Sequence, residues 1–147
     1  MQSITIGKPH EYLRLTAVRW PSDKAPEHLP RQKRRYLQAE LRIRQLTATS
    51  RLDLHDDYAG LVQFFDQAVA TWRDWNNAGA VWGLSSGLRL ELVSGPRPGG
   101  RPDHLILWIK LQDGGGFRHR PWTVETMLVL SPPDLDAFAR DLHELTD

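Results

Sequence analysis

The stretch FFDQAVATWRDW, Phe64–Trp75, places four large aromatic side chains within twelve residues. When the stretch is extended back by three residues, apolar side chains recur at three- and four-residue steps: Leu61, Phe65, Ala68, Trp72 and Trp75. This spacing is typical of one face of an α-helix, and Phe64 and Val69 widen that face. We therefore interpret these aromatics mainly as core side chains rather than as a binding site. Asp56 or Asp57 is expected to cap the helix.

Extended chain precedes this helix. The segments SITI and EYLRLTAVRW carry the β-branched and aromatic residues that strands favour. Residues 36–54 alternate apolar and polar side chains, and the phase slips by one after Gln45. An unbroken strand of that length would run about 63 Å, far beyond a radius of gyration near ~15 Å. A tight hairpin or a bulge near Gln45 is therefore expected.

Three further alternating segments follow the helix: LRLELV (88–93), HLILWIKLQ (104–112) and PWTVETMLVL (121–130). Short, Gly-rich connections join them, which favours an antiparallel meander. A second amphipathic helix is expected over SPPDLDAFARDLHEL (131–145), with Ser131 as its N-cap and Pro132 in its first turn.

The order of strands, helix, strands and helix indicates an α+β fold. The links between strands are too short for parallel crossovers, which need a dozen or more residues. We expect a single domain of residues 1–147. It would contain one curved antiparallel sheet of about six to seven strands, with both helices packed on one face. An exposed Pro-rich basic loop is expected at 21–35.

Helices on one face would leave the opposite sheet face open to water or to a partner. That face would carry Ile106 and Trp108, together with Val93, Met127 and Val129 if the strands pair in phase. Contiguous apolar surface of this kind marks interaction sites. The alternative is that the sheet curls and the N-terminal strands cover the patch. We assign a partner-binding site to these residues: Trp108, Ile106, Met127, Glu91 and Asp74.

The net charge of +1 is spread unevenly along the chain. Residues 1–55 hold 11 Lys/Arg against 5 Asp/Glu, and residues 56–147 hold 8 against 13. The acidic half could meet a basic partner. The alternative is that the two halves intermix in space and their charges cancel.

Catalytic and metal-binding signals are weak. The segment DLHDD (53–57) groups one His with three carboxylates, but a strand end followed by a helix cap explains it as well. The segment FRHRPW (117–122) could bind an anion or could be a solvated turn. With no cysteine in the chain, thiolate zinc sites are excluded. We assign no catalytic residue, no cofactor and no metal ligand.

Neither a secretory signal nor a membrane span is visible, since no basic N-terminal region precedes a long apolar run. We expect a cytoplasmic protein that has no contact with the membrane.

The segments FFDQAVATWRDW, VWGLSSGLRLEL and LDAFARDL, in this order, resemble an actinobacterial domain family of unknown function. They are also similar to immunity proteins paired with wall-associated tRNase toxins. The resemblance covers roughly residues 36–145, and the loop at 21–35 departs from it. It implies a cytoplasmic, non-catalytic protein that binds and neutralises a toxin domain.

Two other functions remain open. A nucleic-acid-binding module would use the basic loop and a sheet platform, with contacts from Arg31, Lys33, Arg34, Arg35, Arg42, Arg44 and Trp108. A small-molecule-binding domain would instead hold its ligand between helix and sheet. The sequence does not set the oligomeric state.

Overall fold

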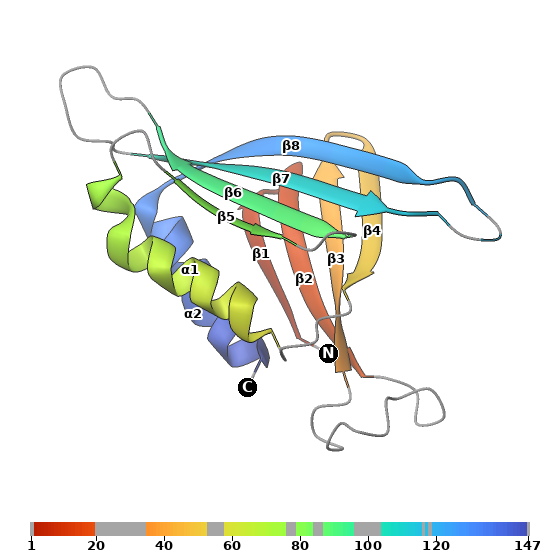
Figure 1. Ribbon diagram of the computed structural model, residues 1–147, viewed down its shortest axis with the longest axis horizontal. Helices are drawn as coiled ribbons and strands as arrows, with labels where there is room; N and C mark the ends of the chain where they lie inside the picture. Colours follow the sequence, from red (N-terminus) through yellow and green to blue (C-terminus); the bar gives the residue numbers. More distant parts are fainter. Residues whose placement is uncertain are drawn as a thin grey trace.

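The computed structural model describes residues 2–19, 35–52, 58–75, 79–83, 87–95, 104–115, 117 and 119–146, with only the backbone at Arg35. Two units of four strands and a helix follow one another (Figure 1). The first unit consists of β1 (Ser3–Lys8), β2 (Glu11–Arg19), β3 (Arg35–Ile43), β4 (Leu46–Leu52) and α1 (Ala59–Thr71), which ends in the short 3-10 helix η2 (Trp72–Asp74). The second consists of β5 (Gly79–Gly83), β6 (Leu88–Ser94), β7 (Leu105–Asp113), β8 (Trp122–Leu130) and α2 (Pro132–Thr146).

Strands β1 to β4 form an antiparallel meander, which we call the N-terminal sheet. The bend expected near Gln45 is a hairpin: Ile43 pairs with Leu46, leaving Arg44 and Gln45 as the turn. Arg44 has a φ of 53°, the left-handed conformation that two-residue hairpin turns require. The phase slip therefore reflects the reversal of the chain.

Strands β5 to β8 form a second antiparallel meander, the C-terminal sheet. The expected alternation is confirmed in β7, where every second residue from Leu105 to Leu111 is buried. Strand β5 was not expected. Its five residues, GAVWG, are bounded by glycines and are too short to show a clear period.

The expected single sheet of six to seven strands is wrong, although the α+β class and the antiparallel pairing are confirmed. Both sheets have an apolar inner layer, for example Leu13 and Leu41 in one and Leu90 and Ile109 in the other. Each layer must be removed from water. The sheets therefore pack together, β4 against β7 and β1 against β8, around one hydrophobic cluster.

The two helices were expected to pack on one face of a single sheet, but they pack against different sheets. Helix α1 follows the N-terminal sheet but packs against β5, whereas α2 follows the C-terminal sheet but packs against β1 and β2 (Figure 1). The two helices also pack on each other, with Phe65 against Phe138 in the core. On the surface, Nε2 of His143 lies 2.8 Å from a carboxylate oxygen of Asp66.

The two helices begin differently. Ser131 and Asp134 form a reciprocal cap at α2: each side-chain oxygen accepts from the other residue's backbone N–H, at 3.3 Å and 3.2 Å. This confirms Ser131 as the N-cap. At α1 the N-cap is Tyr58, in a left-handed conformation with no side-chain cap. The expected capping residues Asp56 and Asp57 lie outside the described residues.

Candidate functional site

The outer face of the C-terminal sheet carries an apolar patch built from two cross-strand rows. The first row runs Val93, Ile106, Val129 and the second Val81, Glu91, Trp108, Met127. We call these two rows the apolar rows. The strands thus pair in the register that was the condition for this patch, with Val93, Met127 and Val129 beside Ile106 and Trp108. Neither the N-terminal sheet nor a helix covers the rows, because both pack toward the inner side.

The apolar rows are open to solvent. Val81 is 54% exposed, and Met127 and Val129 are each 64% exposed, which is unusual for large apolar side chains that lie together. Ile106 and Trp108 are half-buried between them. The alternative, that the N-terminal strands cover this patch, is wrong.

Glu91 is a carboxylate in the middle of the apolar rows. Its cross-strand neighbours are Val81 on one side and Trp108 on the other. It is half-buried and makes no ion pair within the described part of the chain. A binding partner that covers this face must therefore supply a cation or a hydrogen-bond donor at this point.

A charged row borders the apolar rows. It consists of Arg89, Lys110 and Glu125, which are direct cross-strand neighbours, with Lys110 and Glu125 paired at 3.9 Å. The positive and negative charges on this face therefore balance once Glu91 is included. An exposed pair of this kind stabilises the fold by only about 0–1 kcal/mol, so it gives polarity rather than stability.

Asp74, the remaining residue of the expected site, is not on this face. It lies in η2, after α1, and is exposed. Among the described acidic residues of the second half, five lie on the two helices: Asp66, Asp134, Asp136, Asp141 and Glu144. Of the five residues expected to form the partner-binding site, the structure brings Glu91, Ile106, Trp108 and Met127 together on one sheet face and places Asp74 elsewhere.

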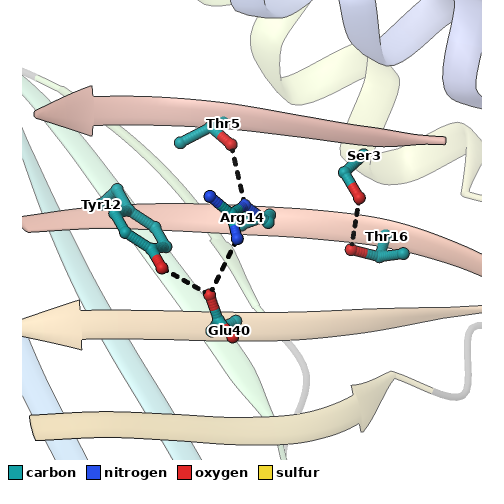
Figure 2. A network of polar contacts seen from close by, with 6 residues as sticks. All are labelled: Ser3, Thr5, Tyr12, Arg14, Thr16 and Glu40. Atoms are coloured by element: carbon teal, nitrogen blue, oxygen red, sulfur yellow. Dashed lines mark hydrogen bonds and ion pairs between the residues drawn. The ribbon is translucent and has the colours of Figure 1, made fainter. Parts of the chain in front are cut away.

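The outer face of the N-terminal sheet carries a network of polar side chains (Figure 2). Glu40 accepts a hydrogen bond of 2.7 Å from the hydroxyl of Tyr12 and one of 3.4 Å from Nη1 of Arg14. Arg14 also donates through Nε to Thr5 at 3.2 Å and stacks over the ring of Tyr12, 4.6 Å from its centroid. The hydrogen bond to Glu40, with burial, raises the pKa of the Tyr12 hydroxyl above 10.0.

Cations outnumber carboxylates on this face. Arg14, Arg42 and Arg51 lie on it, and Glu40 is the single acid among its described side chains. The charges of the two halves therefore do not intermix on the sheets, because each half builds its own sheet. That alternative is wrong for the sheet faces.

A shallow depression of about 510 Å³ lies at one end of this polar face. Its lining residues are Thr5, Gly7, Lys8, Pro9, Tyr12, Arg14 and Arg42. Three of them are cationic and none is acidic. Nε of Arg42 is shielded from water and has no hydrogen-bond partner among the described residues.

The structure does not bring together two of the residues named for the alternative nucleic-acid platform. Arg42 and Trp108 lie on the outer faces of different sheets, so they do not share a surface. Arg44 is exposed in the turn after β3. The side chains of Arg31, Lys33, Arg34 and Arg35 lie outside the described residues.

Two weaker candidate sites come from the segments DLHDD and FRHRPW. The DLHDD segment lies outside the described residues. In FRHRPW, a ring nitrogen of His119 lies 3.0 Å from Asp113. That contact, with the backbone N–H of Gly115, lowers the pKa of the Asp113 carboxyl. No cluster of three potential metal ligands occurs within the described ranges.

The small-molecule site considered between helix and sheet stays a prediction. A second depression, of about 300 Å³, lies at the surface between the start of β1 and the end of α2. In the part of the chain that the structure describes, no helix is long and apolar enough to cross a bilayer.

No protein-family model and no curated protein matches the chain. The resemblance to immunity proteins therefore rests on the sequence segments quoted above.

The cluster of Tyr12, Arg14 and Glu40 was missed from the sequence. Its signal was present in the alternation of β2 and β3, which places all three residues on the polar face of their strands. The missing information was the register, which sets Arg14 opposite Glu40.

Proposed function

We propose that this chain is a non-catalytic protein-binding domain that engages its partner through the apolar rows of the C-terminal sheet. The observation that carries the proposal is the solvent exposure of these two adjacent rows, on a face that no other described element covers. Apolar patches of this kind on a soluble domain are typical of protein interaction sites.

Glu91 sets the chemistry of the partner. A buried interface tolerates an unpaired carboxylate poorly, because the charge loses its water without a compensating group. The partner is therefore a protein that presents apolar side chains around a Lys or Arg. Aromatic and Met side chains, such as Trp108 and Met127, are the residues that interface cores favour.

The more specific proposal is that the partner is a toxin domain which this chain neutralises. It is supported by the quoted resemblance and by Glu91, which favours a cation at the centre of the interface, since nucleases that act on RNA carry basic substrate grooves. A toxin gene beside the gene for this chain would strengthen the proposal.

The test is an affinity capture from the native host with three baits: wild type, Met127→Glu and Thr123→Glu. Thr123 is exposed on the same strand and face, beyond the charged row, so its variant controls for added negative charge. We expect wild type and Thr123→Glu to retain the same protein and Met127→Glu to lose it. Equal retention by all three baits would exclude this surface.

The captured protein is then titrated with purified wild type and Glu91→Lys. Charge reversal should weaken binding by tenfold or more, equivalent to about 1.4 kcal/mol. Neutralisation is read from growth when the captured protein is expressed with or without the chain. If the protein binds but is not toxic, protein binding stands and the toxin proposal fails.

A further inference from the structure

The depression on the outer face of the N-terminal sheet is a second site, separate from the apolar rows. We propose that it binds a phosphate group, with Lys8, Arg14 and Arg42 as the ligating cations. The inference does not depend on the proposed protein partner, since the depression and the apolar rows lie on different sheets.

The lining of the depression is positively charged. Lys8, Arg14 and Arg42 converge on one depression whose lining residues include no carboxylate. Glu40 offsets part of the charge of Arg14 from outside the lining. Glu11 is the cross-strand neighbour of Lys8 but is not among the lining residues. The lining itself is therefore positively charged, which suits a phosphate group carrying one to two negative charges.

Arg42 has a shielded side-chain nitrogen without a hydrogen-bond partner among the described residues. Its guanidinium makes no ion pair or hydrogen bond with any described residue, and its Nε is screened from water. A polar group in this state is costly and rare in folded proteins. An anion bound at the guanidinium would compensate its charge and, after a small rotation of the side chain, could accept from Nε.

The residues that form the floor of the depression are held in place by their neighbours. Gly7, with a φ of 122°, lies opposite Tyr12, and a Cβ at this position would meet the backbone of Glu11 and Tyr12, so the glycine allows β1 and β2 to lie close together beneath the depression. The Tyr12 ring is held by its hydrogen bond to Glu40 and by the stacked Arg14, as Figure 2 shows. The floor is thus fixed before a ligand arrives, which lowers the entropic cost of binding.

Phosphate fits these donors better than a single carboxylate does. A guanidinium presents a planar fork of N–H donors that matches two oxygens of a phosphate, and Lys8 adds a point charge. A peptide carboxylate would bring only one negative charge to the three cations of the lining. The volume of about 510 Å³ is in the range of small-molecule sites.

The test is an NMR titration of the full chain with pyrophosphate, referenced to sodium chloride at equal ionic strength. We expect saturable shifts at the amides of Thr5, Gly7 and Arg42, and none at Thr123. Arg42→Gln should weaken binding about tenfold or more, as expected for the loss of a charged hydrogen-bond donor. Arg51→Gln, on the same sheet face outside the depression, should bind as wild type does.

Two results would overturn the site: the same shifts in sodium chloride alone, or equal pyrophosphate affinity in wild type and Arg42→Gln. If Arg42→Gln fails to fold, Lys8→Gln replaces it, because Lys8 is exposed at a strand end. A single-stranded oligodeoxythymidine then distinguishes the source of the phosphate. Competition at the same amides assigns it to a nucleic-acid backbone, and lack of competition assigns it to a small phosphorylated compound.

Discussion

The rings of Phe65 on α1 and Phe138 on α2 meet edge to face, with their centroids 4.9 Å apart and their planes at 60°. Both side chains are almost completely buried. This contact joins the two helices, and through them the two halves of the chain. Most of the aromatic side chains from Phe64 to Trp75 therefore belong to the core. Trp75 is half-buried at the end and donates through Nε1 to Thr71.

Replacing Phe65 with Ala should lower the free energy of unfolding by about 3–5 kcal/mol, because it removes a fully buried ring and leaves a cavity. Urea denaturation measures the change. The exposed Gln63 is the control on the same helix, and Gln63→Ala should stay within about 0.5 kcal/mol of wild type. Similar losses for the two variants would show that the aromatic face is not core.

Ser131→Ala should destabilise the protein by about 1 kcal/mol, because the backbone N–H of Asp134 loses its acceptor. Ser131→Asp is the matched comparison, since Asp keeps a side-chain acceptor and is as good an N-cap as Ser. Unfolding midpoints of the three proteins, compared at equal slope, provide the measurement. Equal losses for Ala and Asp would contradict a capping role for the side-chain oxygen.

The hydrogen bond from Tyr12 to Glu40 makes stability depend on alkaline pH. The pKa of Tyr12 in the folded protein is raised above 10.0, so the neutral phenol is the form that folding favours. Its contribution is fully present below pH 10.0 and is lost as the pH rises through the folded-state pKa.

Tyr12→Phe should therefore cost about 1 kcal/mol at neutral pH, and its difference from wild type should shrink above pH 10. Absorbance at the phenolate band should lose a transition above 10.0 in the variant. A difference in stability that stays constant across this pH range would rule out the hydrogen bond as its source.

Glu91→Val should leave stability unchanged or raise it by about 0.2–1 kcal/mol, because Val pairs better with Val81 and Trp108 in a strand. The same change should weaken partner binding. Thermal unfolding and titration of the captured partner test the two effects separately. A clear loss of stability would show that Glu91 has a structural role instead.

Alternation along single strands was enough to predict most of what each strand buries. It placed Trp108 and Leu107 on opposite faces of β7, and Met127 and Val129 on the same face of β8. Helical spacing likewise identified Phe65 and Phe138. These predictions succeed because side-chain direction is a local property of backbone geometry.

The division into two sheets could not be predicted in this way. Whether β4 and β5 pair depends on the path of α1 between them, and no local pattern encodes that path. Strand β5 is also too short to show a period. The cluster around Glu40 and the depression at Arg42 depend on register across β1 to β4, which only the assembled sheet fixes.

The exchange of helices between the two halves has a consequence for synthesis. The N-terminal sheet leaves the ribosome before α2, the helix that packs on β1 and β2. A nascent chain that has reached only β4 therefore holds an apolar layer without its final cover, including Leu13 and Leu15. This layer stays open to solvent until the C-terminal sheet and the fifteen residues of α2 have also been translated.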